Sequence, residues 1–296
     1  MYTIDRVNLD LGLLHEDGLC LIARCNLTSV TLELMKMKIH NLKSFDFISK
    51  PSDDAISAAL RELQYLGAVH RMESNSFNLT ELGEKMTLFP LDPRLSKILL
   101  SAVQNGCSEE AIAVIALLSV EQPLYIQPPN KGEAVEKAHM KFFAAEGDHM
   151  KYLKTLRAFN ASPSQAQWCY ENFLSCKGLQ AAENIRRQLR QICQKNGIPL
   201  VSCSSNMNVL RKSICSGMFL QAAELQQDGR YNAVDANITV LIHPSSCLFQ
   251  RNPGCVIYSE LMHTTKTYMK DVLLVDPKWL VEAAPEYFAQ KRLNSS

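Results

Sequence analysis

A change in the spacing of apolar residues after Gly217 most constrains what this chain can fold into. From residue 80 to about 205, apolar side chains recur at the three- and four-residue intervals of a helix face. Residues 208–217 predict one more short helix that ends at Gly217, and after it short runs of strand-forming residues alternate with turn signals such as Asp228-Gly229. The sequence therefore predicts a mainly α chain, in which a helical region precedes a small β-rich domain.

The β-rich region contains five runs that are typical of strands. They span Phe219 to Ala223, Tyr231 to Ala233, Ile238 to Ile242, Cys255 to Leu261 and Tyr268 to Val275. Five short strands in about sixty residues favour a small barrel. Residues 277 to 292, with Trp279 and Leu280, are expected to form one closing helix.

The first eighty residues predict a helix, a second helix and a hairpin. Apolar residues repeat between Thr28 and Met37, and a second helix is announced by Ser52, whose hydroxyl can cap the free amides. Its apolar stripe ends at Gly67. Two short strand-like runs, at 69–72 and 77–79, then flank a polar turn. This order is typical of a winged helix.

Between residues 80 and 205 the pattern predicts a helical bundle. Prolines divide the stretch at Pro90, Pro93, Pro123, Pro128, Pro129 and Pro163. The longest helix is expected from Leu179 to Asn196, with Ile185, Leu189 and Ile192 facing inward.

Charge and cysteines exclude several classes of protein. Lys plus Arg total 31 and Asp plus Glu total 30, so any nucleic-acid contact must be local. The 10 cysteines include no Cys-x-x-Cys pair, which favours reduced thiols over a zinc site or a disulfide framework. No apolar run approaches the 18 or so residues that span a bilayer. We therefore expect a protein of the cytosol or nucleus.

Nine segments together resemble the C-terminal modules of DEAH-box RNA helicases. Three are Leu241-Ile-His-Pro-Ser-Ser246, the stretch from Tyr258 to Val272, and Val275-Asp-Pro-Lys-Trp-Leu280. Six lie upstream, namely Asn26-Leu-Thr-Ser-Val30, Phe45-Asp-Phe47, Leu63-Gln-Tyr-Leu-Gly-Ala68, Thr80-Glu-Leu-Gly83, Phe89-Pro-Leu91 and Glu146-Gly-Asp-His149. Because they agree with the family in order and spacing, the resemblance extends over roughly residues 25 to 290.

The resemblance implies a multi-domain fold, mainly α with a small β-barrel. Its expected parts are a winged-helix domain (25–80), a helical ratchet domain (81–205) and an OB-fold domain with a C-terminal helix (206–296). Residues 1–24 match nothing in the family and stay unassigned. The family is nuclear, nucleolar or cytoplasmic.

The motor of that family has no counterpart in the sequence. A complete family enzyme binds ATP and Mg²⁺ in two RecA-like domains, yet none of the 12 glycines begins a Gly-x-x-x-x-Gly-Lys-Ser/Thr loop and no Asp-Glu-Ala-His occurs. We expect no cofactor, no catalytic residue and no ATP hydrolysis by these residues alone. The chain looks like a truncated isoform or fragment.

Two groups of hydroxyl-bearing residues are candidate RNA contacts in the β-rich region. Thr264, Thr265 and Lys266 combine a cation with hydroxyls, which suits phosphate oxygens, and the resemblance places them at the RNA channel. The alternative is a solvated turn. Ser245 and Ser246 follow His243-Pro244, where their hydroxyls either contact a backbone phosphate or close a turn.

Two further candidates lie in the helical region. Arg186, Arg187 and Arg190 share one helix face and can track a phosphate backbone, or can be solvated or paired with acids. Glu146-Gly-Asp-His149 offers carboxylates and an imidazole without a nucleophile or metal set. The resemblance implies a helix start there, with Asp148 near the cap and His149 as a possible RNA contact.

The expected winged helix carries an acidic recognition face. Asp53, Asp54 and Glu62 oppose the single Arg61, so DNA reading is disfavoured. The resemblance implies instead a seat for a glycine-rich-patch activator peptide. Two hypotheses result: an RNA-binding region that braces a helicase motor, and a protein-interaction module that binds activators or other partners.

Overall fold

The fold is taken from a computed structural model, which describes residues 27–39, 41–42, 45–47, 50–72 and 76–294. The unassigned residues 1–24, the motif residue Asn26 and part of the expected wing turn (73–75) lie outside these ranges. The chain divides after Ser96 into two compact units, which are described separately below.

The described residues of the first unit form helices α2, α3 and α4, one hairpin and the start of α5 (Pro93–Gln104). Helices α2 (Leu27–Lys36) and α3 (Asp53–Tyr65) pack against each other around buried Val30, Leu34, Leu42 and Ile56. Strands β1 (Val69–Arg71) and β2 (Phe77–Leu79) pair antiparallel, and α4 (Glu81–Met86) follows. This order confirms the predicted winged helix.

Local signals set the boundaries of α3. The Ser52 hydroxyl accepts a hydrogen bond from the Ala55 amide at 3.2 Å, as an N-cap does. At the other end, Gly67 has a φ of +75°, a left-handed conformation that glycine adopts without a steric penalty. Both ends of this helix confirm the sequence prediction.

The second unit begins with a helical bundle. Helix α5 (Pro93–Gln104) crosses the boundary at residue 96. It is followed by α6 (Ser108–Leu118), α7 (Gly132–His139), the 3₁₀ turn η3 (Met140–Phe142), α8 (Asp148–Ala161), α9 (Gln165–Glu171), α10 (Cys176–Lys195) and α11 (Met207–Met218). Every residue of α6 from Ala111 to Leu117 is buried, because α6 lies between α8 and α10. Among the described residues, no helix has both the length and the apolar character to cross a membrane.

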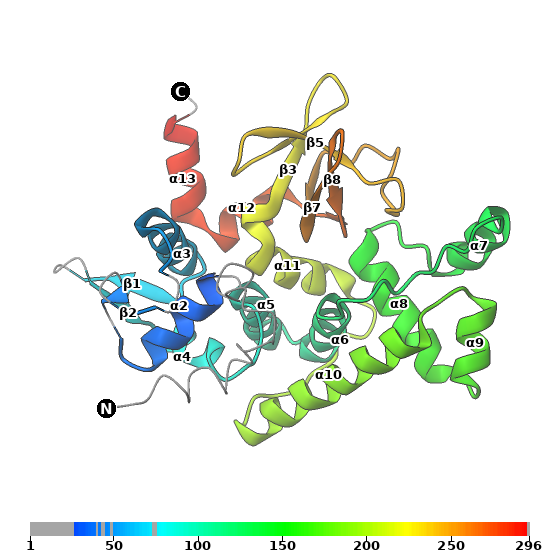
Figure 1. The fold of residues 1–296 in the computed structure, drawn as a ribbon, viewed down its shortest axis with the longest axis horizontal. Helices are drawn as coiled ribbons and strands as arrows, with labels where there is room; N and C mark the ends of the chain where they lie inside the picture. The colour runs from blue at the N-terminus through cyan, green and yellow to red at the C-terminus, as the bar shows by residue number, and fades with distance from the viewer. Residues whose placement is uncertain (1–26, 40, 43–44, 48–49, 73–75, 295–296) are drawn as a thin grey trace. The chain divides into compact units, whose positions relative to one another are not determined.

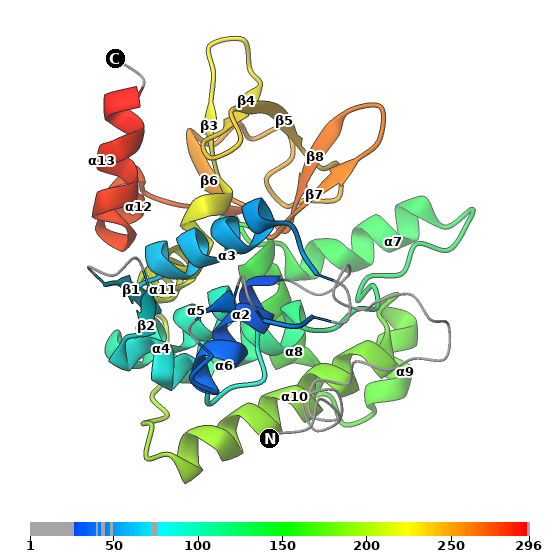
Figure 2. The same ribbon diagram turned by 60° about the vertical axis from the view of Figure 1, so that its left-hand side comes forward.

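A curled seven-stranded sheet follows the turn η4 (Phe219–Gln221). Its strands are β3 (Ala222–Leu225), β4 (Tyr231–Ala233), β5 (Ile238–Ile242), β6 (Cys255–Ile257), β7 (Glu260–His263), β8 (Thr267–Lys270) and β9 (Leu273–Leu274). The order across the sheet is β7-β8-β5-β4-β3-β6-β9, and only the β5–β8 pair is parallel. Figures 1 and 2 both show the sheet above α8 and α11.

Alternation of inward and outward residues builds the core of this sheet. Tyr231 and Ala233 on β4, and Val240 and Ile242 on β5, point into one buried cluster that also contains Met269. The OB-fold predicted for this region is therefore present, in the form of a curled sheet.

Three of the five expected strands were wrong in extent. The run from Cys255 to Leu261 divides at Tyr258, because β6 pairs with β3 and β9 while β7 pairs with β8. The run from Tyr268 to Val275 divides at Asp271, whose φ of +52° ends β8. Residues 219–221 form η4 instead of the start of a strand.

The prediction of a single closing helix over residues 277 to 292 was also wrong. Residues 277 onward form α12 (Pro277–Ala283) and α13 (Pro285–Asn294), separated at Ala284. Ala284 has φ −147° and ψ 72°, outside the helical region. The cause is Pro285, whose ring disfavours a helical conformation in the residue before it.

Candidate nucleic-acid interface

The second unit joins its helices to its sheet at the start of α8. The Asp148 amide donates to the Val272 carbonyl at 2.8 Å, and the Leu274 amide donates to the Glu146 carbonyl at 2.9 Å. Gly147, between them, bridges antiparallel to Leu273. Segment 146–149 thus continues the sheet beyond β9. We call residues 146–149 and 271–274 the joint.

Glycine is required at the centre of the joint. Gly147 has a φ of +125°, and a Cβ atom there would lie 2.3 Å from the Val272 carbonyl oxygen. No side chain fits that distance, so only glycine allows the two backbones to approach.

The Asp148 carboxylate fastens the sheet to α8. One oxygen accepts from the Cys247 amide at 2.7 Å and the other from the Val272 amide at 2.8 Å, and the residue is only 4% exposed. Asp148 is the first residue of α8, after the N-cap Gly147. Both oxygens are therefore committed to backbone amides, which leaves this carboxylate no role in acid–base chemistry.

His149, a predicted RNA contact, is completely buried in the joint. Its Nε2 lies 3.3 Å from the Ser259 hydroxyl, and its Nδ1 has no hydrogen-bond partner. Burial lowers the pKa of His149 to about 4, although the neighbouring Asp148 carboxylate acts in the opposite direction. The imidazole is neutral at pH 7, and an RNA contact by His149 would require the joint to open.

A second contact between α8 and the sheet lies beside the joint backbone. The Tyr152 hydroxyl donates to the Asp271 carboxylate. Burial raises the pKa of Asp271 and the tyrosine hydrogen bond lowers it, with a net rise. Burial also raises the pKa of Tyr152. This pair therefore adds to the attachment of the sheet.

Ser245 and Ser246 lie in the loop that follows β5. The Ser245 hydroxyl is exposed and lies 2.7 Å from His243 Nδ1, whereas Ser246 accepts from the Leu248 amide through its hydroxyl at 3.2 Å. The next residue, Cys247, is the one held by Asp148. The structure therefore closes turns with both serines and leaves Ser245 accessible.

Thr264, Thr265 and Lys266 form the tip of the β7–β8 hairpin, and all three are exposed. The Thr264 hydroxyl donates to the Lys266 carbonyl at 3.0 Å, so it stabilises the turn. Figure 2 shows this hairpin extending away from the sheet.

The hairpin tip and the serine loop lie at opposite ends of the sheet. Strands β5 and β8 are parallel, with Leu241 opposite Tyr268. The tip precedes β8, whereas the serine loop follows β5. The two predicted groups are therefore separated by the length of a short strand, roughly 13 Å at 3.3 Å per residue.

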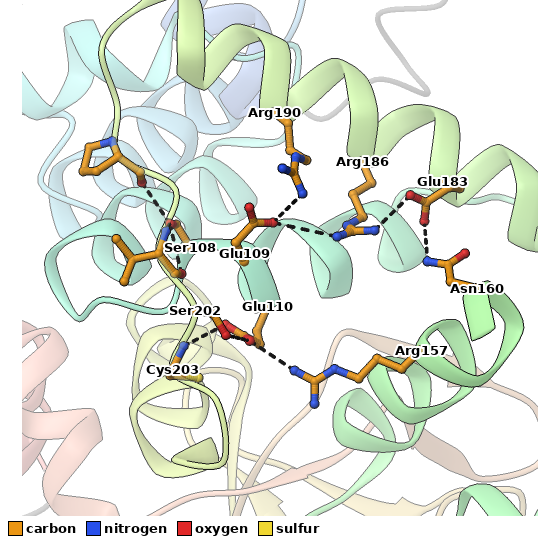
Figure 3. A network of polar contacts seen from close by, with 12 residues as sticks. Ser108, Glu109, Glu110, Arg157, Asn160, Glu183, Arg186, Arg190, Ser202 and Cys203 are labelled. Carbon is orange, nitrogen blue, oxygen red and sulfur yellow. Dashed lines mark hydrogen bonds and ion pairs between the residues drawn. The ribbon is translucent and has the colours of Figure 1, made fainter.

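The predicted arginine stripe on α10 is mostly paired with acids. Arg190 contacts Glu109 at 2.9 Å, and Arg186 contacts Glu183 at 2.9 Å and Glu109 at 3.8 Å (Figure 3). These contacts join α10 to α6. Arg187 is exposed on the same helix. In this structure Arg186 and Arg190 are therefore paired with acids, as in the second of the two interpretations of the stripe.

Glu110, next to Glu109, organises a different part of the bundle. It accepts from Ser202 at 2.6 Å and from the Cys203 amide at 3.1 Å, and contacts Arg157 at 3.1 Å (Figure 3). Burial opposes ionisation, but these hydrogen bonds prevail and lower the pKa of Glu110. The two adjacent carboxylates thus stabilise α10 and segment 202–203 separately.

Sequence reasoning missed four cations whose close partners are neutral: Lys141 in η3, Lys151 and Lys154 on α8, and Arg251 in the loop between β5 and β6. Lys154 donates to the Phe143 carbonyl at 2.9 Å, and the Arg251 guanidinium lies 4.5 Å from the centre of the Phe143 ring. Lys151 lies 3.9 Å from the centre of the Tyr125 ring, and Lys141 donates to the Asn172 amide oxygen at 3.1 Å. We call Lys141, Lys151, Lys154 and Arg251 the cation cluster.

The charge of this cluster is left available to a ligand. Within the described part of the chain, none of the four cations has a carboxylate within 4.0 Å, and only Lys151 is half-buried while the others are exposed. Lys151 acts electrostatically on the Asp271 carboxylate and favours its ionised form, and that carboxylate is already bound to Tyr152. The sequence signal was faint: Lys151 and Lys154 are one turn apart on α8, but Arg251 is distant in the chain.

Cations with neutral partners can bind phosphate without first breaking an ion pair. Among the residues that the structure describes, no three His, Cys, Asp or Glu side chains gather to hold a metal ion.

Comparison with protein families gives three matches, in chain order. Residues 59–91 match the winged-helix part and residues 92–152 the ratchet-like part of the helicase-associated domain HA2. Residues 210–287 match the oligonucleotide/oligosaccharide-binding (OB) fold. Of the cation cluster, Lys141 and Lys151 lie in the ratchet-like match and Arg251 lies in the OB match.

The chain is also similar to two curated proteins. They are ATP-dependent RNA helicase DHX33 of Homo sapiens and that of Mus musculus, each 43% identical over 270 residues. The match covers 91% of this chain but 38% of either relative, so the chain spans well under half of their length.

Proposed function

Because this chain belongs to the DEAH-box RNA helicases as their C-terminal winged-helix, ratchet-like and OB-fold region, we propose that it binds single-stranded RNA through the backbone and braces a helicase motor. The proposed site is the cation cluster together with the exposed loop that carries Ser245. The chain provides the path for the strand, and the motor that moves it is a separate part of a complete enzyme.

The cation cluster is the observation that carries this proposal. Lys154 and Arg251 both contact Phe143: Lys154 donates to its carbonyl, and the Arg251 guanidinium lies over its ring. Neither contact neutralises the positive charge. Since the joint fixes α8 to the β5–β6 loop, these cations are positioned before a ligand arrives. A preorganised set of cations loses little freedom on binding phosphates.

We further propose that these residues do not hydrolyse ATP alone. The family enzyme uses ATP and Mg²⁺, but the sequence contains no phosphate-binding loop that fits a nucleotide triphosphate. A nuclear, nucleolar or cytoplasmic location is part of the same proposal.

The predicted RNA contacts fall into two classes under this proposal. Ser245 and the tip residues Thr264, Thr265 and Lys266 are accessible, and Lys266 has no carboxylate partner among the described residues. Arg186, Arg190, His149 and Ser246 are engaged in structural contacts. Both classes stay predictions, and the structure supports them less than it supports the cation cluster.

Binding of a fluorescent single-stranded oligoribonucleotide to the full chain tests the proposal. We expect binding that weakens as salt rises, with no RNA-stimulated ATP hydrolysis. Lys266→Ala tests the hairpin tip separately: a loss of affinity would extend the site along the sheet, and unchanged affinity would confine it to the joint. Binding that is absent or insensitive to salt would contradict the proposal.

A second candidate function is a protein-interaction module in the first unit. Met37, Met72 and Leu88 are exposed there, at 44%, 40% and 39%. Exposed apolar side chains favour protein partners, and the acidic start of α3 disfavours nucleic acid. A glycine-rich-patch activator is the partner that the family implies.

Light scattering after size exclusion separates the two candidates. The chain is mixed either with a glycine-rich-patch peptide or with RNA, and a complex with the peptide in the absence of RNA supports the second function. Replacing Met37 and Met72 by Gln should then abolish the peptide complex and leave RNA binding unchanged.

A further inference from the structure

One large aromatic side chain is exposed beside the cation cluster. Phe249 is 39% exposed and lies in the loop between β5 and β6, two residues before Arg251. Ile238 is similarly exposed, at 37%, but lies at the far end of β5. Met140, at 59%, is exposed next to Lys141, so Phe249 differs from the other exposed apolar residues in being an aromatic side chain within two residues of a cation of the cluster.

The backbone around Phe249 is tightly constrained. Its amide donates to the Ser246 carbonyl at 3.2 Å, and the Arg251 amide donates to the Leu248 carbonyl at 3.1 Å. Leu248 is buried in the core of the sheet, and the preceding Cys247 is held by Asp148. The position of Phe249 is therefore set by the sheet and the joint.

Two residues that flank Arg251 adopt left-handed conformations. Gln250 has a φ of +60° and Asn252 a φ of +47°, values that non-glycine residues rarely adopt. Such strain persists only where the surrounding structure imposes it. Here the loop bends so that Leu248 enters the core while Phe249 and Arg251 remain exposed.

The neighbours of Phe249 suit a polynucleotide. Arg251 and Lys154 attract phosphates, and an aromatic ring beside a phosphate path offers a surface on which a base can stack. Bases of a single strand are available for stacking, whereas those of a duplex are already stacked on each other. An aromatic residue at this place therefore distinguishes single strands from duplexes.

We propose that Phe249 stacks on an unpaired base of the strand whose phosphates the cation cluster binds. This inference rests on the proposed RNA binding and adds to it a residue that selects single-stranded nucleic acid. Phe249 carries no charge, so its contribution is independent of salt and separable from that of Lys154 and Arg251.

The test compares two probes on the full chain at fixed salt: a short oligoriboadenylate and a strand of the same length with abasic residues. Phe249→Ala should weaken binding of the oligoriboadenylate about 5- to 150-fold, the equivalent of about 1–3 kcal/mol. It should leave binding of the abasic strand unchanged, because that strand has phosphates but no bases.

Two further variants separate stacking from simple apolar contact. Phe249→Trp should retain affinity, while Phe249→Leu should lose nearly as much as Phe249→Ala, because leucine has similar size but no aromatic face. Ile238→Ala is the matched control and should bind like the unaltered chain. Thermal unfolding of each variant verifies that the fold persists.

Three outcomes overturn the inference. Equal affinity of Phe249→Ala and the unaltered chain, with salt-sensitive binding intact, removes the stacking role and leaves the proposed function standing. Equal losses on both probes assign Phe249 a structural role. Absence of RNA binding by the unaltered chain overturns the proposed function and this inference together.

Discussion

Asp148 and Val272 are hydrogen-bonded to each other twice. The Asp148 amide donates to the Val272 carbonyl at 2.8 Å, and the Val272 amide donates back to the Asp148 carboxylate at 2.8 Å. This reciprocal contact fastens the ratchet helix α8 to the sheet, and the cation cluster depends on it for its geometry.

Asp148→Ala is expected to destabilise the chain by about 3–5 kcal/mol. The change leaves the amides of Cys247 and Val272 without their acceptors, and hydrogen bonds to charged groups contribute about 1.5–3 kcal/mol each. Urea denaturation measures the loss. Asp276→Ala removes an exposed helix cap and should cost only about 1 kcal/mol. Similar losses for the two variants would show that the joint contributes little.

Gly147→Ala is expected to lower the free energy of unfolding by at least about 2 kcal/mol, because the methyl group meets the Val272 carbonyl and the φ of +125° is unfavourable for alanine. Gly132→Ala is the matched control, since a Cβ there meets no atom within 4 Å. It should be neutral or slightly stabilising. The prediction fails if both substitutions have the same effect on the urea midpoint.

The stability of the chain should fall as pH drops from about 6.5 towards 4, in part through His149. Burial lowers the pKa of the folded imidazole to about 4, so in this window the unfolded chain binds a proton that the folded chain does not. Above the unfolded pKa the contribution is constant. His149→Gln cannot titrate, so its unfolding free energy should depend less steeply on pH between 7 and 5. Parallel pH profiles for the two proteins would contradict a neutral, buried His149.

Arg190→Gln should reduce stability by about 1 kcal/mol or less and leave RNA affinity unchanged. Its guanidinium is paired with the half-buried Glu109, and partly exposed pairs of this kind contribute little. Denaturation and RNA titration of the same variant give both quantities. A fall in RNA affinity at unchanged stability would instead support the phosphate contact predicted from the sequence.

Features set by neighbouring residues were predictable from the sequence. Ser52 and Gly67 mark the ends of α3 by their own conformational preferences, and the strand-like run from Ile238 to Ile242 forms β5 with the bounds that were predicted. Errors occurred where a partner decides the outcome. Nothing within Cys255 to Leu261 shows that its two halves pair with different strands.

The candidate site was harder to predict for the same reason. Spacing showed that Arg186 and Arg190 share a face but could not show that Glu109 lies opposite. Phe143 contacts both Lys154 and Arg251, although Arg251 lies 108 residues after Phe143 in the chain. Sequence spacing contains no sign of that contact. The Asp148 interaction with Val272 spans 124 residues.

The salt dependence of RNA binding tests the central claim most directly. For a single strand, each phosphate contact changes the slope of log association constant against log salt concentration by about −0.7. Four cations therefore predict a slope near −3. The triple variant Lys141→Gln/Lys154→Gln/Arg251→Gln should reduce it to about −1. The control Lys177→Gln/Arg187→Gln/Lys195→Gln removes equal charge from exposed positions on α10 and should keep the original slope. A slope that survives in the first variant and falls in the control would contradict RNA binding at the joint.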